Sequence, residues 1–377
     1  MSGVYLWGEN FNHNKRKDDI IPIKLNKLIQ QDNFEIEKII EKLEELQNLE
    51  INYNKTKEIH GEILTLASYN SNKIIKNIID KNHFIYNNQF GFLNGATLNL
   101  LILKIVLLYF DSSQIYLLQK FFETFSEWDW KFPVKLEKLT QKSESWFEES
   151  EINYRKSQYL SKYINYSNEE RIRLEKHTNP TMVVLTLGYP EQNCSYNVNY
   201  STRRIILKEF ENGNNMVKII KNNNKENEAI LKAWNDWLNG TSFMTKYKHF
   251  LLILCLDENL LNKRENLFDE SENYCRFIES RIRLELIFTV EEDQEQIKYT
   301  HATSHEKCVP KEIKEKYSGQ YIQHWWVGIE TNKLIKQVEF NKNDGNILNK
   351  FVQNINNKTP SVLLNKSRKP RTASEFP

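Results

Sequence analysis

Three short acidic runs are the first places to look for metal-dependent chemistry in this 377-residue sequence. They are Asp18-Asp19, Asp269-Glu270 and Glu291-Glu292-Asp293. Two-metal phosphoryl transfer needs carboxylates that converge on Mg²⁺ ions, beside a Gly-Ser turn that holds a triphosphate. The sequence contains no Gly-Ser dipeptide, and acidic runs in loops or on polar helix faces are usually solvated. We therefore expect no catalytic metal site.

His301, His305 and Cys308 form a second set of ligand types, at a spacing that zinc could use. A structural zinc site needs a fourth ligand in a closed tetrahedron, and no Cys-x-x-Cys pair accompanies these residues. The sequence also lacks a Gly-x-Ser-x-Gly elbow, a P-loop and a dinucleotide fingerprint. We expect this chain to bind no metal and no cofactor.

Residues 189–203 are the most distinctive polar stretch. A Tyr-Pro pair opens this stretch, and an apolar-periodic run follows it at Ile205, Ile206, Leu207 and Phe210. The order predicts a shaped turn that leads into a helix, with Ser201 or Thr202 as its cap. By composition alone, a polar turn before an ordinary surface helix accounts for it as well.

Helical periodicity dominates the first 240 residues. The expected helices cover residues 34–49, 63–67, 72–81, 98–109 and 114–126, and another stops at Asn239-Gly240. Phe121, Phe122 and Phe125 recur at helical spacing, which favours core packing over base stacking. Residues 138–176 are polar and rich in Glu, Ser and Lys, so we expect a long loop or insertion there.

The pattern changes after residue 240. Strands are expected at residues 247–256, 297–300, 325–329 and 334–340, and helices at 273–288 and 346–355. This order is typical of a small split βαβ, or ferredoxin-like, sandwich, the shape of RNA-recognition modules. The predicted fold class is therefore α+β, with a helical domain followed by an RRM-like α+β domain.

Overall charge and cysteine usage say little about partners but something about the compartment. The balance of 52 Lys+Arg against 50 Asp+Glu leaves a net charge of +2, so a nucleic-acid surface would have to be local. Four widely spaced cysteines without a secretory pattern indicate a reducing, cytoplasmic setting. The most apolar segment, residues 98–110, is short and contains Lys104, so we expect a buried helix and no membrane span.

Three segments of the sequence resemble landmarks of the eukaryotic poly(A) polymerase family. Residues 189–203 resemble its Tyr-Pro to Tyr-Asn-Val-x-x-Ser-Thr-Arg signature. Residues 84–95 resemble its Ile-Tyr-x-Asn-x-x-Gly-Phe-x-Gly-Gly loop, and residues 121–133 its Phe-Phe to Ser-x-Trp-x-Trp-Pro-x-Pro segment. Further landmarks of the family's RNA-binding domain match at residues 246–250, 277–283 and 325–328. The resemblance runs in order from about Gly61 to about Lys342.

The composition and the resemblance together predict a four-part organisation. Residues 1–50 would be a divergent arm with an amphipathic helix, and 51–240 a middle helical domain like that of poly(A) polymerases. Residues 241–355 would be the RRM-like RNA-binding domain, and 356–377 a disordered basic tail. The family's nucleotidyltransferase head is expected to be missing, and catalysis with it.

The nucleotide site that the resemblance implies is partly altered. Tyr86, Asn88, Gly95 and Thr202 match family positions that contact sugar, base or backbone, and we treat them as a vestigial nucleotide site. The lysine that reaches the triphosphate falls at Asn77, and the first glycine of the Gly-Gly turn falls at Asn94. These matched residues could equally be kept because they shape the turn.

RNA contacts are expected from cations in the C-terminal half. They are Lys246, Lys248, Arg281 and Arg283, with Lys366, Arg368, Lys369 and Arg371 in the tail. On a strand, Lys246 and Lys248 would share one face. Salt bridging to the acidic turn before it would compete with phosphate contact at Arg281.

The leading functional hypothesis is a non-catalytic poly(A) polymerase-like protein that binds RNA or an RNA-processing partner. Members of the family that lack the head are associated with AT-rich cytoplasmic killer plasmids of yeasts, where they resemble immunity factors against toxins that cut tRNA or other RNA. The Asn-, Lys- and Ile-rich composition is that of an AT-rich genetic element. The partner would be RNA, tRNA included, or the toxin ribonuclease. The alternative is an accessory subunit of a polyadenylation or RNA-processing complex, with catalysis in trans.

Overall fold

The computed structural model describes the chain in segments. They are residues 83–109, 112, 114–136, 146–160, 179–187, 190–222, 237, 240, 242–257, 274–287, 290, 296–303, 315, 321–332, 341, 342 and 345–358, with residues 41, 42, 45, 58 and 62. The chain divides into two compact units, Met1–Asn88 with Phe92–Thr241, and Gln89–Gly91 with Ser242–Pro377. Helices and a small antiparallel sheet make the fold α+β, as predicted.

Several predicted elements lie outside the described residues. They are the arm and helix of residues 1–50 (apart from 41, 42 and 45), the helices at 63–67 and 72–81, the strand at 334–340 and the tail at 356–377 beyond residue 358.

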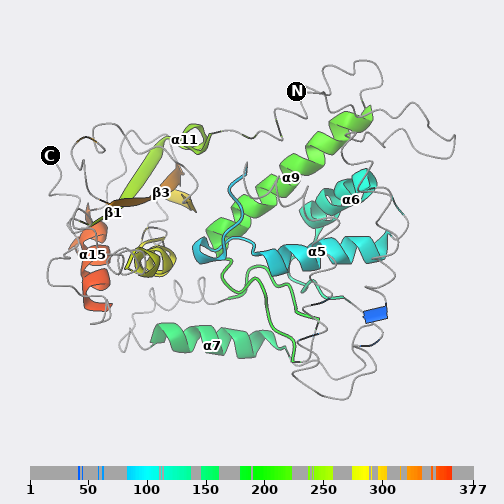
Figure 1. Ribbon diagram of the computed structural model, residues 1–377, viewed down its shortest axis with the longest axis horizontal. Helices are drawn as coiled ribbons and strands as arrows, with labels where there is room; N and C mark the ends of the chain where they lie inside the picture. Colours follow the sequence, from blue (N-terminus) through cyan, green and yellow to red (C-terminus); the bar gives the residue numbers. More distant parts are fainter. Residues whose placement is uncertain are drawn as a thin grey trace. The chain divides into compact units, whose positions relative to one another are not determined.

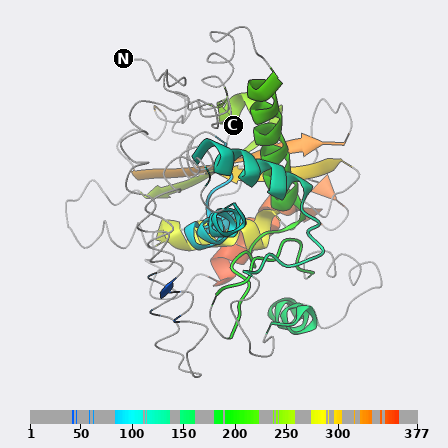
Figure 2. The ribbon, with the colours of Figure 1, turned by 90° about the vertical axis from the view of Figure 1, so that its right-hand side faces the viewer.

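The core of the first unit forms where α6 (Gln114–Glu127) packs against both α5 (Gly95–Leu108) and α9 (Tyr200–Asn222). These helices lie together in Figures 1 and 2. Phe121 is fully buried and meets Phe125 and Phe210 edge to face, with ring centroids 5.1 and 5.5 Å apart. Such pairs add to the stabilisation from burial, so the aromatic spacing of α6 is core packing, as predicted.

Helix α5 is buried along most of its length, including its one lysine. Lys104 is only 9% exposed, and its Nζ donates to the carbonyl oxygen of Lys135 at 3.0 Å. The long side chain thus carries its charge out of the apolar core to a backbone acceptor. Among the described residues, no helix has both the length and the apolar character needed to cross a bilayer.

Helix α7 (Glu148–Leu160) corrects the prediction that residues 138–176 form a long loop. The helix has no clear apolar stripe, so its period is hard to read from the sequence. Local charges stabilise it instead. Glu148, Glu149 and Glu151 lie near its positive N-terminal end, and Arg155 pairs with Glu151 one turn later.

The second unit contains a three-stranded antiparallel sheet within the described residues. Strand β3 (Tyr321–Thr331) lies between β1 (His249–Asp257) and β2 (Ile297–Thr303) and is antiparallel to both. β1 and β2 are therefore parallel to each other. Between them the chain forms a helix at 274–281 that continues as the π-helical segment η4 (Ile282–Ile287). This connection across a central strand is the split βαβ order that the sequence predicts.

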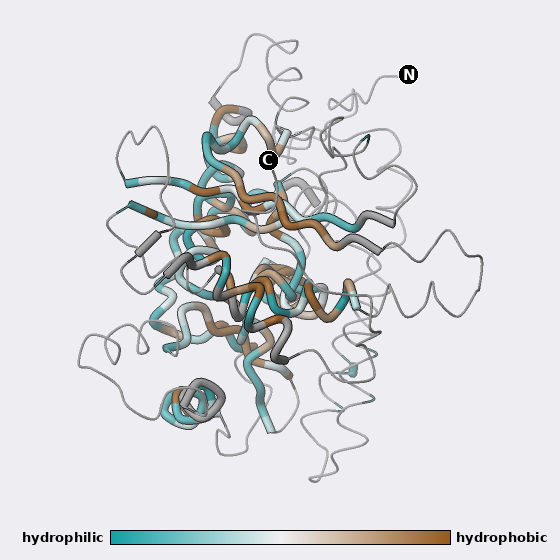
Figure 3. Tube along the Cα trace, turned by 90° about the vertical axis from the view of Figure 1, so that its left-hand side faces the viewer, coloured by the Kyte–Doolittle hydropathy of each residue, from teal (hydrophilic) through white to brown (hydrophobic). Residues whose placement is uncertain are grey.

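The second unit also contains α11 (Phe243–Lys246), ahead of β1, and α15 (Ile347–Lys358), which packs against η4. The short strands β4 (Asn341–Lys342) and β5 (Gly345–Asn346) pair with each other. Figure 3 shows hydrophobic stretches alternating with hydrophilic ones along the trace, and in β3 residues 325–329 are buried.

The two faces of the sheet carry different partners. On one face Cys255 of β1 meets Cys275 of the 274–281 helix. On the other face the ring of Tyr247 lies against Gly328 of β3, where a Cβ atom would come within 2.2 Å of the ring. Phe250 lies directly opposite Gly328 in the pairing of β1 and β3, so both are on the same face. Cys255 is five residues from Phe250, and because side chains alternate along a strand, it lies on the other face. Only a glycine at 328 leaves room for this stacking.

Candidate functional site

The loop at residues 84–93 is closed by its own backbone. Leu93 N donates to Ile85 O at 3.3 Å, and Phe92 N donates to Asn87 O at 3.1 Å. Gly91 has φ 87°, a left-handed conformation that favours glycine. The loop therefore has a defined shape and presents the side chains of Tyr86 and Asn88, both half-buried.

Asn94 joins this loop to the polar stretch at 189–203. Its Oδ1 accepts from Thr97 N at 2.7 Å, which makes it the N-cap of α5. Its Nδ2 donates to the carbonyl oxygen of Cys194 at 3.2 Å, and the Thr97 hydroxyl donates to the same oxygen at 3.1 Å. Asn94 stands where the family pattern has a glycine, and its side chain bonds both to its own helix and to the polar stretch.

The predicted nucleotide contacts fall into one neighbourhood of the first unit. A Cβ atom on Gly95 would lie 3.3 Å from the Tyr86 hydroxyl, so these two residues touch. Asn88 accepts a hydrogen bond through its carbonyl oxygen from Asn197 Nδ2 at 3.0 Å. The structure thus brings Tyr86, Asn88 and Gly95 together and ties them to the polar stretch.

Thr202 has a structural role in this geometry. It is 2% exposed, and its hydroxyl lies 3.0 Å from both Asn199 N and Asn199 Oδ1. Thr202 N donates in turn to Asn199 Oδ1 at 2.8 Å. This reciprocal pattern is a capping box in which Asn199 is the cap, so the prediction of Ser201 or Thr202 as cap was wrong. Helix α9 begins at Tyr200, earlier than its apolar run indicates.

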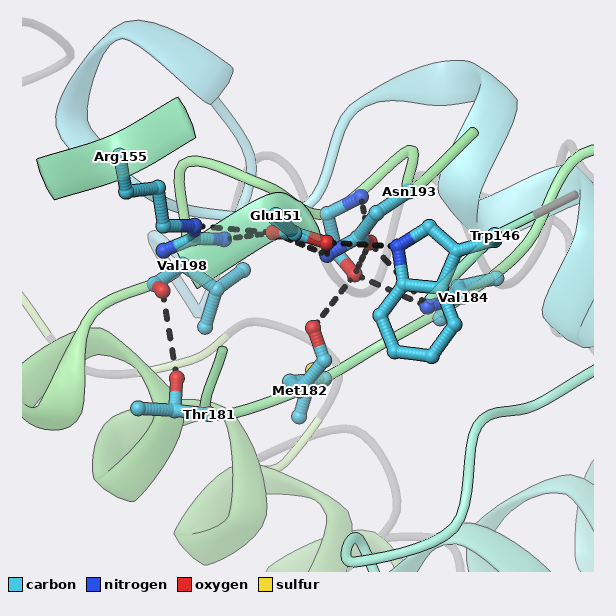
Figure 4. A network of polar contacts seen from close by, with 9 residues as sticks. Trp146, Glu151, Arg155, Thr181, Met182, Val184, Asn193 and Val198 are labelled. Atoms are coloured by element: carbon cyan, nitrogen blue, oxygen red, sulfur yellow. Dashed lines mark hydrogen bonds and ion pairs between the residues drawn. The ribbon is translucent and has the colours of Figure 1, made fainter. Parts of the chain in front are cut away.

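Asn193 organises the centre of the polar stretch (Figure 4). Its Oδ1 accepts from Ser195 N at 2.9 Å and from Val184 N at 3.3 Å. Ser195 Oγ donates to Met182 O at 2.8 Å. Asn193 and Ser195 are 8% and 2% exposed, so these bonds replace water inside the fold. The polar stretch is therefore an ordered turn that is hydrogen-bonded to residues 182–184.

Glu151 of α7 holds the same turn from outside. Asn193 Nδ2 donates to its two carboxylate oxygens at 3.0 and 3.1 Å. Trp146 Nε1 donates to Oε2 at 2.8 Å, and Arg155 Nε donates to Oε1 at 2.8 Å (Figure 4). The carboxylate is 9% exposed and the Arg155 side chain 12%. The buried Glu151 carboxylate therefore links α7 to the polar turn, and no sequence motif of α7 predicts this role.

The four predicted RNA-binding cations that the structure describes lie on different elements of the second unit. Lys246 ends α11 and Lys248 lies in a bend before β1 starts at His249, so neither lies on a strand and the shared face that a strand would give them does not arise. Arg281 and Arg283 lie on the 274–281 helix and η4, and this helical segment packs on the face of the sheet opposite to the Tyr247 ring (Figure 1). The guanidinium of Arg281 sits 5.2 Å from the ring centroid of Phe277, a cation–π contact. Lys366, Arg368, Lys369 and Arg371 lie outside the described residues.

A different basic surface is present on α9, and the sequence reasoning missed it. Tyr200, Arg204 and Lys208 follow one another at intervals of four residues and are exposed, Tyr200 by 39%. Residues so spaced lie on one face of a helix. We call them the α9 stripe. The four-residue spacing is visible in the sequence, but the apolar residues between these positions indicate a core-facing helix more strongly than a binding surface.

A metal centre finds no support in the part of the chain that the structure describes. No group of three or more His, Cys, Asp or Glu side chains there could hold an ion. His301 is fully buried, and its Nδ1 lies 2.6 Å from the Tyr247 hydroxyl oxygen. His305, Cys308 and the three acidic runs lie outside the described residues.

Comparison with known proteins finds, over part of the first unit, the same similarity that its motifs indicate. Residues 70–233 match the family model described as the poly(A) polymerase central domain. Two similar proteins come from Candida albicans, poly(A) polymerase PAPa and poly(A) polymerase PAPalpha, each 26% identical to this chain over 200 and 199 residues. Nuclear poly(A) polymerase 4 of Arabidopsis thaliana is 27% identical over 177 residues.

The shared region is a part of each relative. It covers 53% of this chain and 30% of each Candida protein, and 46% of this chain and 20% of the Arabidopsis protein. The chain is thus similar to poly(A) polymerases over residues 70–233, and this region contains loop 84–95, α7 and the polar stretch.

Proposed function

We propose that this poly(A) polymerase-like chain binds RNA, carries out no nucleotidyl transfer of its own, and protects cells from a killer toxin that cleaves RNA, tRNA included. The main observation behind the non-catalytic part is that the Asn94 side chain occupies its position through hydrogen bonds to other parts of the fold. The resemblance places a glycine there, next to the nucleotide, and glycine leaves backbone free to approach a ligand. Here an amide side chain fills the position and is bonded to Thr97 and Cys194.

Two further positions support the absence of catalysis. Asn77 stands where the resemblance places the lysine that reaches the triphosphate, so the charge that would stabilise the phosphates is missing. Thr202 is buried and bonded to Asn199. What remains of the nucleotide site, Tyr86 and Asn88, supports the shape of the loop.

The α9 stripe supports RNA binding by the first unit. An exposed tyrosine next to two exposed cations combines a stacking surface with phosphate-binding charge, the pairing that single-stranded RNA sites use. The stripe begins at the residue that follows the cap Asn199, so the rigid polar turn sets its position. Lys246 and Lys248 would supply a second, separate contact in the other unit.

The protective role rests on the family resemblance and on composition. An Asn-, Lys- and Ile-rich sequence fits an AT-rich cytoplasmic element, and a cytoplasmic protein would meet a toxin where tRNA is cut. Protection could act by shielding the RNA, by sequestering the toxin or by favouring repair. The α9 stripe favours the first route, since it offers RNA a direct contact.

An incorporation assay tests the non-catalytic part. The purified chain is incubated with ATP, Mg²⁺ or Mn²⁺ and an oligo(A) primer, and we expect no extension. Extension by the pure protein would overturn the proposal. Extension that appears only with a co-purified nucleotidyltransferase would instead support the accessory-subunit alternative, in which catalysis is supplied in trans.

A binding assay tests the RNA part. Arg204→Glu with Lys208→Glu should weaken binding to single-stranded RNA and reduce the slope of log affinity against log salt by about 0.7 for each lost phosphate contact. Lys218→Glu, an exposed charge reversal farther along α9, is the matched control. Lys246→Glu with Lys248→Glu probes the second unit. Unchanged slopes in both double variants would remove RNA contact from these surfaces.

A survival assay tests protection. Cells that express the chain should survive an RNA-cleaving killer toxin better than cells with an empty vector. The Arg204→Glu/Lys208→Glu variant should lose this advantage if shielding is the route, while Lys218→Glu keeps it. No advantage against any cognate toxin would remove the protective role and leave the RNA-binding proposal standing.

A further inference from the structure

Two thiols meet in the core of the second unit. Cys255 lies on β1, opposite Gln323 of β3, and Cys275 lies on the 274–281 helix. Their sulfur atoms are 2.9 Å apart, and each residue is 4% exposed. Ile278 on the same helix and Ile282 at the start of η4 are 6% and 0% exposed. Neither thiol takes part in the proposed RNA contacts.

We propose that Cys255 and Cys275 are a site of reversible disulfide modification. A disulfide bond is about 2.05 Å long, so the sulfur atoms need to approach by only about 1 Å. The strand and the helix already bring the two sulfur atoms together inside the second unit. The site is independent of the RNA-binding proposal.

The reaction balances with a low-molecular-weight disulfide such as oxidised glutathione as the oxidant. One cysteine thiolate attacks a glutathione sulfur, and the first glutathione leaves as a thiol. The second cysteine thiolate then attacks the protein sulfur of the mixed disulfide, and the second glutathione leaves. Two cysteine thiols lose their protons and are oxidised, and one glutathione disulfide is reduced to two thiols.

The position of the pair explains how the oxidant enters and what the bond changes. Both thiols are buried in the folded protein, so the oxidant reaches them when this part of the unit opens locally. Once formed, the bond closes the chain between β1 and the helix and holds that helix against the sheet. Arg281 and Arg283 lie farther along the same helix and its π-helical continuation. The bond therefore fixes the element that carries them.

Disulfide mapping on the full chain tests the site. The protein is incubated with oxidised glutathione, free thiols are blocked with iodoacetamide in urea, and the unreduced chain is digested with trypsin. Cleavage after Lys263 and Arg264 separates the two cysteines. We expect one linked pair of peptides that contains Cys255 and Cys275, lighter than the sum of the free peptides by two hydrogens. Dithiothreitol should release it.

Variants separate the specific bond from general oxidation. Oxidised wild type and Cys194→Ser should melt several degrees above their reduced forms, because the bond restricts the unfolded chain. Cys255→Ser and Cys275→Ser should show no such shift. Both thiols alkylated after oxidant treatment, glutathione adducts without the internal bond, or a bond to Cys194 or Cys308 would each overturn the proposal. The wild-type mapping decides the matter even if a variant fails to fold.

Discussion

Asn94 Nδ2 lies 3.2 Å from the carbonyl oxygen of Cys194, 100 residues along the chain. The same side chain caps α5 through its Oδ1. One amide thus does two things at once: it ends the loop at 84–93 and it fastens the polar turn at 193–199 to the start of a buried helix. A glycine at this position could do neither, so the change from the family pattern alters both ligand access and loop anchoring.

Asn94→Gly should therefore lower the free energy of unfolding by about 1–2 kcal/mol, since it removes a cap and a hydrogen bond between two loops. Urea unfolding of the full chain measures the change. Asn94→Asp keeps the cap oxygen but places a carboxylate against the Cys194 carbonyl, and Thr97→Val removes only the other bond to that oxygen. If Asn94→Gly were as stable as wild type, the anchoring role would be wrong.

Glu151→Gln should destabilise the first unit by about 2–4 kcal/mol, because it removes a buried charge that three donors share. Arg155 would keep its charge without a carboxylate, and Asn193 would lose an acceptor. Thermal melts and urea unfolding give the magnitude. Glu149→Gln, an exposed acid two residues away on α7, is the control and should stay within about 0.5 kcal/mol of wild type. If the two variants lost the same free energy of unfolding, the stabilising role of the Glu151 network would be wrong.

Sequence reasoning succeeded where period and spacing decide the structure. Phe121, Phe122 and Phe125 predict a buried helix face, and the strand–helix–strand order after 240 predicts the split βαβ arrangement. It failed where contacts decide. Nothing local to α7 shows that its Glu151 will find Asn193, which follows 42 residues later. Likewise, nothing in the motif around Thr202 shows that its hydroxyl will bond to Asn199.

Boundary errors in the second unit have a similar origin. The apolar run from Tyr247 looks continuous with β1, but the ring of Tyr247 stacks on Gly328 and its hydroxyl meets His301, so the strand begins two residues later. The alternation that would place Lys246 and Lys248 on one face therefore never starts. Tertiary contacts of one aromatic residue overrode a pattern that the local sequence supports.

Cys194 should react slowly with iodoacetamide in the folded protein. Burial raises the pKa of its thiol to about 11 from an ordinary value of 9.0, so at neutral pH the thiolate fraction falls about 100-fold and the alkylation rate with it. The rate should climb through pH 9 to 11. Because the folded form favours the protonated thiol, this group stabilises the fold fully below about pH 9 and loses that contribution as pH rises toward 11.

Peptide mapping after timed alkylation measures the Cys194 rate, and the same reaction in urea is the reference, since unfolding restores an ordinary pKa. A folded rate equal to the urea rate at pH 8 would show that the thiol is not shielded.

Gly213→Ala should destabilise α9 although alanine is the better helix former. A Cβ atom at 213 would lie 2.4 Å from a ring carbon of Phe122, whose own side chain is 2% exposed and packed against Phe210 and Trp237. Helix propensity would contribute about 1 kcal/mol in favour of alanine. Forcing the ring to move in a close-packed core costs about 1–3 kcal/mol, and we expect a net loss because the overlap is deep.

The exposed helix position 215 isolates the propensity term. Asn215→Ala on the same helix meets no ring, so it should be neutral or slightly stabilising. Urea unfolding of both variants against wild type separates the two contributions. A Gly213→Ala protein that unfolds at the same urea concentration as Asn215→Ala would mean that Phe122 can move aside without loss, and the aromatic core of α6 and α9 would be less tightly packed than its geometry indicates.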